Sequence, residues 1–378
     1  MKVLVLNAGS SSLKFSLTDT EDERHLLRGS VERIGLDHPL LQMGGEEREV
    51  AAPDHRAALE QVLKQVPVNE VNAVGHRVVH GGDYTTSSLI TPAVLERLEE
   101  YAPLAPLHNP ANIAGIRAAL AAMPDLPQVA VFDTAFHQTM PERAWRYAIP
   151  RELADENRYR RYGFHGTSHR YVSRRLAEQM GRPLTELRLI VLHLGNGASA
   201  SAVKFGKSVD TSMGFTPMEG LVMGSRAGDV DPGLVLELAR KLGAEKAGEL
   251  LNKQSGLLGL SGYSDLRDLH RAIAAGSDSA EMALRIYTYR IKKYVGAYAA
   301  IMGGLDGVAF TAGVGENDAE VRRRSMAGLE FLGIELDEAA NHTGGPLISS
   351  ATSRVEVRVV PTDEELAIAL DTERVLAG

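Results

Sequence analysis

The sequence predicts an α/β protein with two duplicated domains. Its 378 residues exceed the usual size of a single hydrophobic core, so two domains are expected. Short apolar runs typical of buried strands alternate along the chain with segments whose apolar residues have helical spacing. In addition, one strand–loop–strand design occurs twice, beginning with the apolar runs at 3–6 and 189–194.

The first loop, between the expected strands at 3–6 and 13–17, contains groups that suit a phosphate. Gly9 allows close approach of the backbone, Ser10 and Ser12 can donate hydrogen bonds, and Lys14 brings a positive charge. Taken alone, the segment is equally consistent with an ordinary polar hairpin turn.

The second loop follows the strand at 189–194 and has a similar composition. A duplicated domain would place the two loops on either side of a cleft, where they could bind a polyphosphate together. Three polar residues align at one constant offset: Asn7, Ser10 and Ser12 with Asn196, Ser199 and Ser201.

The first half of the chain continues with a polar meander at 24–50, a helix at 54–65 and a strand at 71–74. Thr91 and Asn109 each precede a proline, which predicts two helix N-caps with proline in the first turn. The second of these helices has apolar residues at helical spacing that we expect in the core: Ile113, Ile116, Leu120 and Met123.

In the second half, the charged run at 151–161 predicts a solvated helix face. We expect Thr167 or Ser168 to cap a helix that ends at Met180, while His165 lies in the preceding glycine-flanked turn. Pro232 begins a further helix behind Asp231.

A long helix, capped by Asp278 or Ser279, should then reach about Met302. Thr362 should cap the last helix, with Glu365 at the reciprocal capping-box position. The expected buried positions of the long helix are Met282, Ile286, Tyr289, Val295 and Met302.

Two arginines are candidates for binding an anion. Arg77 follows an apolar strand and precedes mobile glycines, where a guanidinium could bind a carboxylate or a phosphoryl oxygen. An ion pair with a nearby acid is the alternative for Arg77. Arg226 lies in a segment with four glycines at 214, 220, 224 and 228, which suggests a flexible loop carrying one cation.

Asp133 follows the apolar strand at 129–132 and is a catalytic candidate. The alternative is an aspartate that forms a turn or caps a helix.

Composition excludes several classes of protein. The net charge of −8 and the pI near 5.9 argue against a general nucleic-acid binder. The absence of cysteine excludes disulfides, thiolate metal sites and cysteine catalysis. No apolar run approaches the roughly 18 residues of a membrane span, and Met1 leads directly into a strand, so we expect a cytoplasmic location.

Two common nucleotide motifs are also missing. The strand at 308–311 runs into a glycine turn and a helix, but the turn lacks the third glycine of a dinucleotide fingerprint. The sequence Gly206-Lys207-Ser208 has Ser201 where a P-loop requires its first glycine.

Eight segments, in order along nearly the whole chain, make the sequence similar to the acetate kinase family. They are residues 7–15, 75–82, 132–138, 163–169, 193–197, 223–229, 310–317 and 361–366. The resemblance implies two ribonuclease-H-like domains of the actin, Hsp70 and sugar kinase type, with ATP and a small carboxylate meeting in a central cleft. It implies an N-terminal domain at 1–145, completed by the helix at 363–378, and a nucleotide-binding domain at 146–362.

The resemblance also implies roles for individual residues. Asp133, His165, Arg226 and Arg77 would act in catalysis, with Arg77 also holding the carboxylate. Val79, Leu107, Phe164 and Pro217 would form an apolar pocket around the methyl group of the carboxylate substrate. Nucleotide contacts would come from Ser10, Ser12, Lys14, His193, Leu194, Gly195, Asn196, Gly197, Asp265, Leu266, Arg267, Gly313, Val314, Gly315, Glu316 and Asn317. Asn7 and Glu364 would belong to the environment of Mg²⁺, or of Mn²⁺, through bound water. Without the resemblance, Glu364 is simply an acidic residue in a first helical turn.

The implied activity is the reversible, direct in-line transfer of the γ-phosphoryl group of ATP to acetate, giving acetyl phosphate and ADP. A carboxylic acid with a pKa of about 4–5 is already ionised at neutral pH, so the attack needs no general base. We therefore expect Asp133 to position Mg²⁺-bound water or an arginine.

The nearest alternative function is a propionate or butyrate kinase, because one methylene group changes the free energy of binding by only about 1–3 kcal/mol. A more remote alternative function is that of an ATP-gated binding protein of the actin and Hsp70 type. The family further implies a homodimer.

Overall fold

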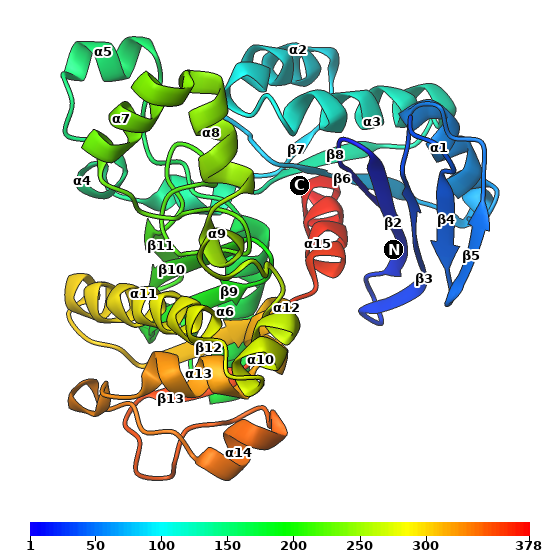
Figure 1. Ribbon diagram of the computed structural model, residues 1–378. Coiled ribbons are helices and arrows are strands. Elements are labelled where there is room, and N and C mark those ends of the chain that lie inside the picture. Colours follow the sequence, from blue (N-terminus) through cyan, green and yellow to red (C-terminus); the bar gives the residue numbers. More distant parts are fainter. The chain divides into compact units, whose positions relative to one another are not determined.

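The computed structural model describes all 378 residues, Met1–Gly378 (Figure 1). The chain divides into two compact units. Unit 1 comprises Met1–Gln138, Gly166–Ser168 and Asp363–Gly378, and unit 2 comprises Thr139–His165 and His169–Thr362. The domain boundaries expected from the sequence, 1–145 with 363–378 and 146–362, stay predictions.

Unit 1 is built on an eight-stranded mixed sheet with the order β5-β4-β3-β2-β1-β6-β8-β7. The first five strands form an antiparallel meander, of which β3, β4 and β5 lie in the segment 24–50 where a meander was expected. β6 and β8 run parallel to β1. The strands are β1 (Lys2–Ala8), β2 (Ser12–Asp19), β3 (Arg24–Glu32), β4 (Leu40–Met43), β5 (Glu46–Glu49), β6 (Ala73–Val78), β7 (Ser88–Leu89) and β8 (Gln128–Phe132).

Helices cover both faces of this sheet because side chains alternate along β1. Leu4 and Leu6 belong to one buried cluster with α1 (His55–Leu63) and α3 (Asn109–Ala122). Val3 and Val5 belong to another with α15 (Glu364–Ala377), which packs on β1, β6 and β8 (Figure 1). The remaining helices of unit 1 are η1 (Val68–Glu70), α2 (Pro92–Tyr101), η2 (Ala102–Leu104) and η3 (Ala135–Thr139), whose last residue counts with unit 2.

Close packing of α15 on β6 depends on Gly75. A Cβ atom at this position would lie only 2.8 Å from Cγ2 of Ile368 on α15. A larger residue would therefore push the helix away from the strand.

Unit 2 repeats the central part of the unit 1 sheet. Its five strands have the order β11-β10-β9-β12-β13, and each pairing has the same direction as in β3-β2-β1-β6-β8. The strands are β9 (Arg188–Leu194), β10 (Ala198–Lys204), β11 (Lys207–Thr211), β12 (Gly307–Thr311) and β13 (Glu356–Val359). The prediction of a duplicated α/β fold is confirmed.

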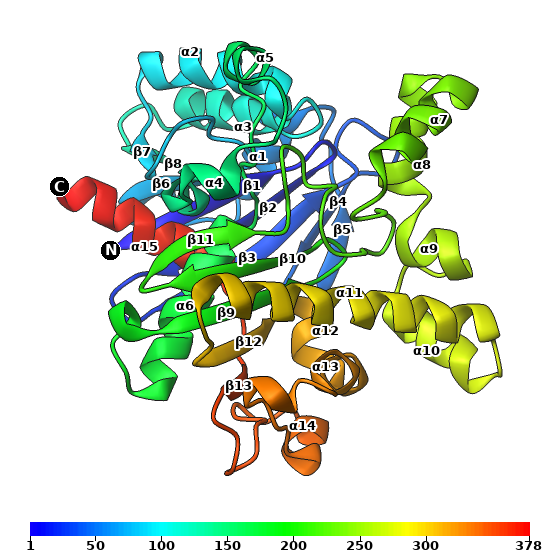
Figure 2. The ribbon, with the colours of Figure 1, turned by 90° about the vertical axis from the view of Figure 1, so that its left-hand side faces the viewer.

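The long helix α11 (Asp278–Met302) packs on β9 and β10, as Figure 2 shows. α10 (Leu266–Ala274) and α13 (Ala319–Met326) pack against α11 in turn. The other helices from residue 142 onward are α4 (Glu142–Trp145), α5 (Arg151–Glu156), α6 (Gly166–Met180), η4 (Leu184–Glu186), α7 (Pro232–Leu242), α8 (Ala244–Lys253), α9 (Gly256–Ser261), α12 (Ala312–Asn317), η5 (Glu330–Leu332) and α14 (Glu338–Thr343). None of the helices combines the length and the apolar character that crossing a bilayer would demand.

Several expected helix caps are wrong, although Thr91 and Asp231 do cap α2 and α7. Asn109 is already inside α3 and uses its amide on the backbone of His80 instead. The remaining caps are displaced by one to three residues: Ser277 caps α11, Asp363 caps α15, and His165 precedes α6.

Other expectations about burial and register also need correction. Met282 and Tyr289 on α11 are exposed, because the buried stripe runs through Leu284, Tyr287 and Ile291 instead. The charged run at 151–161 contains only the short helix α5, and Arg161 beyond it donates to backbone carbonyls at 211–213.

The two polar loops do not align as the constant offset suggested. β1 and β9 both have seven residues, and each pairs through its second residue with the first residue of β6 or β12. This register makes Asn7 equivalent to His193, three residues before Asn196. Asn7 lies at the end of a strand, whereas Asn196 lies in the turn between β9 and β10. The loops are related by fold and not residue by residue.

Candidate functional site

Unit 1 holds Arg77 in a cluster with two carboxylates. Arg77 lies on β6, which is longer than predicted, and Asp133 follows β8, the next strand of the sheet. Nη2 of Arg77 donates to Oδ2 of Asp133 at 2.7 Å, and Nε donates to the same oxygen at 3.1 Å. The carboxylate of Glu364, in the first turn of α15, lies 3.6 Å from Nη2 of Arg77. Asp133 is therefore paired with Arg77, and its expected role of positioning an arginine or Mg²⁺-bound water stays a prediction.

The electrostatics of this cluster favour a charged guanidinium. Burial alone would lower the pKa of Arg77, but the charges of Asp133 and Glu364 raise it above its ordinary value. Asp133 is only 1 % exposed, and this burial raises its pKa while Arg77 opposes the rise. The backbone also holds Asp133, because its carbonyl accepts from Gly166 N at 2.8 Å.

Two asparagines that the sequence analysis missed as supports fix the chain after β6. Oδ1 of Asn112 accepts from Val79 N at 3.0 Å, and its Nδ2 donates to Ala8 O at 2.6 Å. Asn109 makes the corresponding pair of bonds with the backbone of His80. Both lie on α3, where helical spacing of the apolar residues gave no indication of them.

The first polar loop is a short turn at 9–11 between β1 and β2. Gly9 N donates to Ser12 O at 2.8 Å, and Nε2 of His55 lies 2.7 Å from Gly9 O as its donor. Asn7 and Lys14 face each other across the ladder beside this turn, and Ser10 and Lys14 are exposed.

In unit 2, histidines gather around Ser199 at the start of β10. Nδ1 of His165 lies 2.9 Å from Oγ of Ser199, and Nε2 of His169 lies 2.7 Å from the same oxygen. The rings of His165 and His193 stack with their centroids 4.2 Å apart. His165 has the left-handed φ of 55° at the start of α6, which presents its ring to this cluster. The sequence pointed to His165 and His193, and to Ser199 only as one polar residue of the second loop.

Arg226 is half-buried and has no carboxylate within ion-pair distance. Its Nη1 donates to Pro217 O at 3.1 Å, so its other donors remain available. A Cβ atom built on Gly197 would lie 3.6 Å from Cε1 of His165 and 3.7 Å from Nη1 of Arg226. The hairpin turn therefore lets the two side chains converge. Burial lowers the pKa of Arg226, and an anion beside it would offset that cost.

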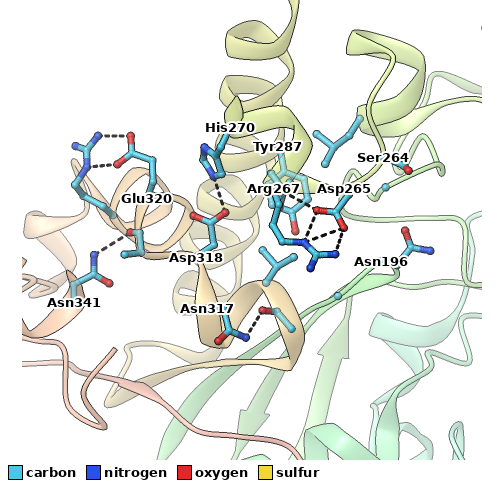
Figure 3. Close-up of a pocket in the computed structure, with 18 of the residues that line it drawn as sticks. Asn196, Ser264, Asp265, Arg267, His270, Tyr287, Asn317, Asp318, Glu320 and Asn341 are labelled. Atoms are coloured by element: carbon cyan, nitrogen blue, oxygen red, sulfur yellow. Dashed lines mark hydrogen bonds and ion pairs between the residues drawn. The ribbon is translucent and has the colours of Figure 1, made fainter. Parts of the chain in front are cut away.

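Beside this turn lies a cavity of about 1000 Å³ that belongs entirely to unit 2 (Figure 3). Gly224 N donates to Asn196 O at 3.1 Å and so ties the loop of Arg226 to the rim of this cavity. Asp265 caps α10 and forms a bidentate pair with Arg267, and Nδ2 of Asn317 donates to Gly313 O. The lining of the cavity includes eight of the residues predicted to contact the nucleotide: Gly195, Asn196, Asp265, Leu266, Arg267, Gly313, Val314 and Asn317.

The other nucleotide candidates of unit 2 lie outside this lining: His193, Leu194, Gly197, Gly315 and Glu316. Glu316 turns its carboxylate to the backbone, where Oε1 accepts from Ala312 N at 2.9 Å and from Thr362 N at 3.2 Å. Glu316 thus supports the junction at which β12 passes directly into α12.

A buried arginine that the sequence analysis did not select holds one wall of the cavity. Arg322 is 1 % exposed and donates to the carbonyls of Gly315, Glu316 and Asn341 and to Oδ1 of Asn341. It thereby fastens α12 to α14. A charged residue in a helix is usually solvated, so the sequence gave no signal for this burial.

The four residues predicted around a methyl group occupy different surroundings. In unit 1, Val79 follows β6, and Leu107 is 66 % exposed. In unit 2, Phe164 is buried, and Pro217 offers its carbonyl to Arg226.

The donor set in unit 1 fits a magnesium ion that arrives with its ligand. No group of three or more histidine, cysteine or acidic side chains could enclose a metal. Mg²⁺ usually keeps several waters and takes one or two carboxylates together with substrate phosphates. Glu364 and the amide of Asn7 are oxygen donors of the kind this ion prefers.

Comparisons with known proteins agree over the whole chain. The sequence model of the acetokinase family matches residues 2–370. An acetate kinase of Coprothermobacter proteolyticus is 52 % identical, with 100 % of both chains covered. An acetate kinase of Streptomyces griseus is 54 % identical over 98 % of this chain and 95 % of its own. A crystal structure of Porphyromonas gingivalis acetate kinase has a TM-score of 0.95 at 48 % identity, covering 99 % of each chain. A propionate kinase from Francisella tularensis has a TM-score of 0.94 at 40 % identity, also over 99 % of each chain.

Proposed function

The chain belongs to the acetokinase family, and from this premise we propose that it transfers the γ-phosphoryl group of ATP to acetate, reversibly, giving acetyl phosphate and ADP. One observation carries the proposal. Arg226 is a half-buried cation without a carboxylate partner, and it converges with His165 on the turn at Gly197. Such a pair suits an anion that is present only during turnover.

The chemistry needs little covalent help from the protein. Acetate is ionised at neutral pH, so one of its oxygens can attack the γ-phosphorus directly. A bond forms between that oxygen and phosphorus while the bond to the β–γ bridging oxygen breaks, and ADP leaves with the electron pair. The protein mainly has to position both substrates and stabilise the charge on the transferring group.

We assign separate roles to the charged side chains. Arg226 and His165 stabilise the oxygens of the transferring phosphoryl group. Arg77 binds the carboxylate, and Asp133 orients its guanidinium through the bidentate bond. Asp133 is a positioning residue in this scheme.

Asn7 and Glu364 would hold Mg²⁺ in this proposal, through water molecules. The ion, when bound with the nucleotide, neutralises phosphate charge. Lys14, Ser10 and Ser12 would bind phosphate oxygens, and the cavity of unit 2 would take the nucleoside.

We also propose a cytoplasmic homodimer. Met282 and Tyr289 lie seven residues apart, on one face of α11, and both are exposed, which suits contact with a second copy of the chain. Light scattering at several concentrations tests this, and a monomer throughout would refute it.

Trapping of the acyl phosphate tests the proposed activity. The protein is incubated with ATP, Mg²⁺ and hydroxylamine, together with acetate, propionate or butyrate, and the hydroxamate is measured. We expect the highest rate with acetate. Hydroxamate formed faster from propionate or butyrate would move the proposal to that acid. ATP binding without hydroxamate from any acid would refute it in favour of an ATP-gated binding protein.

A further inference from the structure

Tyr287 places a buried hydroxyl without any protein partner in the wall of the unit 2 cavity. It lies on α11, is 1 % exposed and lines the cavity (Figure 3). No protein atom donates to its hydroxyl or accepts from it. Leaving a buried polar group unpaired is costly, so a hydroxyl in this position points to a ligand that completes its hydrogen bond.

Three pairs of charged or titratable side chains around the same cavity are, by contrast, already engaged with each other. Asp265 pairs with Arg267, and Glu320 pairs with Arg323. Nε2 of His270 lies 2.7 Å from Oδ2 of Asp318, so this pair joins α10 to the start of α13 across the cavity wall. Figure 3 shows these pairs around the place where Tyr287 lies.

The chemistry of the hydroxyl indicates which part of a nucleotide it meets. Burial raises the pKa of Tyr287, so the phenol stays neutral. A neutral hydroxyl can both donate and accept, which suits the ring edge of a nucleobase. The charged phosphates are better served by glycine-turn N–H groups and cations, and the ribose hydroxyls by carboxylates.

We propose that Tyr287 is the residue that hydrogen-bonds the nucleobase edge of the bound nucleotide. This inference rests on the proposed function, because it assumes that the cavity receives the nucleoside. The contact supports affinity for ATP without excluding other purines, since the same hydroxyl can serve either a donor or an acceptor on the ring.

The test compares Tyr287→Phe with Tyr298→Phe. Tyr298 lies on the same helix, is likewise buried and lacks a partner for its hydroxyl, but it does not line the cavity. Binding of ATP, 2′,3′-dideoxy-ATP and inorganic tripolyphosphate is measured by calorimetry, with thermal unfolding of the ligand-free protein recorded in parallel.

We expect Tyr287→Phe to weaken ATP and dideoxy-ATP equally, by about threefold to tenfold, as for one lost hydrogen bond. Tripolyphosphate binding should not change, because it has no base. Tyr298→Phe should bind all three ligands as the wild type does. Neither variant should lower the unfolding temperature of the ligand-free protein, since neither loses a bond within the chain.

Three results would overturn the inference. Unchanged ATP affinity would show that the hydroxyl does not meet the ligand. An equal loss for tripolyphosphate would show that the substitution disturbs the whole cavity. A loss for ATP that disappears with dideoxy-ATP would place the hydroxyl on the ribose. Because binding is measured without turnover, the contact can be tested even if no acyl phosphate is formed, and that failure would refute only the proposed function.

Discussion

The two units share a five-stranded frame but treat their candidate arginines in opposite ways. In unit 1, Arg77 is neutralised by Asp133 and has Glu364 close by. In unit 2, Arg226 has only a backbone carbonyl and a methionine sulfur as acceptors. The paired arginine is held in one orientation before any ligand arrives, whereas the unpaired one has charge left for an incoming anion.

The difference also shows what the duplication did and did not supply. In the common register of the two sheets, the position of Arg77 on β6 corresponds to Thr311 on β12. Arg226 lies instead in the irregular segment between β11 and α7. The repeat therefore accounts for the frame, and each unit acquired its charged residues at its own positions.

Replacing Arg226 by alanine should have the largest effect. A cation that stabilises a transferring phosphoryl group contributes about 10³–10⁵ in kcat, and we expect a loss in that range. Lysine should restore only a small part, because it offers a point charge and no planar fork. The hydroxamate assay measures both variants, and near-normal turnover of Arg226→Ala would mean that the free guanidinium serves another purpose.

Replacing Asp133 by asparagine should destabilise unit 1. Removing one partner of a buried ion pair costs about 3–5 kcal/mol, and we expect the lower part of this range because Glu364 remains near Arg77. Urea unfolding of the wild type and each variant measures the change in the free energy of unfolding. Glu237→Gln removes the solvent-exposed pairs with Arg240 and Lys241 and should cost much less than Asp133→Asn. Equal losses in the two variants would contradict the burial argument.

Gly75→Ala should cost about 1–3 kcal/mol, because the added methyl group meets Ile368 on α15. The corresponding residue of unit 2 is Ala309, which is tolerated in the same register. Thermal unfolding of Gly75→Ala and the wild type measures this loss of stability. If Gly75→Ala were as stable as the wild type, α15 would not need the close approach to β6 that distinguishes unit 1.

The smallest expected effect concerns the His270–Asp318 pair of unit 2. The hydrogen bond that His270 donates to the Asp318 carboxylate raises the pKa of His270 above its ordinary 6.5, and partial burial opposes the rise. A raised histidine pKa stabilises the fold fully below the unfolded value near 6.5 and loses that stabilisation as the pH rises through the folded pKa. His270→Gln should therefore be less stable than the wild type at pH 5–6, with the two converging at alkaline pH. A constant difference at all pH values would assign the effect to packing.

Local patterns in the sequence were sufficient for most of the frame. Apolar runs located the buried strands, and proline after Thr91 or Asp231 located two helix starts. The boundary of β6 was harder to predict, because Gly75 and the polar residues that follow it interrupt the apolar run although they lie on a strand.

The residues that support the candidate site could not be predicted from local sequence patterns. Arg322 and Asn112 act through bonds to other segments of the chain, and nothing in their immediate neighbours indicates that a charge or an amide is buried. Tyr289 shows the opposite error, since its helical spacing suggested a core position that the buried face of α11 excludes. Periodicity gives the phase of a helix only approximately, and packing decides it.

The comparison of the two arginines is tested most directly by the acetate KM and the kcat of Arg77→Lys and Arg226→Lys, measured side by side with folding checked by thermal unfolding. The account predicts that Arg77→Lys raises the KM for acetate strongly, because lysine has no planar fork with which to bind Asp133 and a second carboxylate together. Arg226→Lys should lower kcat with little change in that KM. The same change in both constants for the two variants would contradict it.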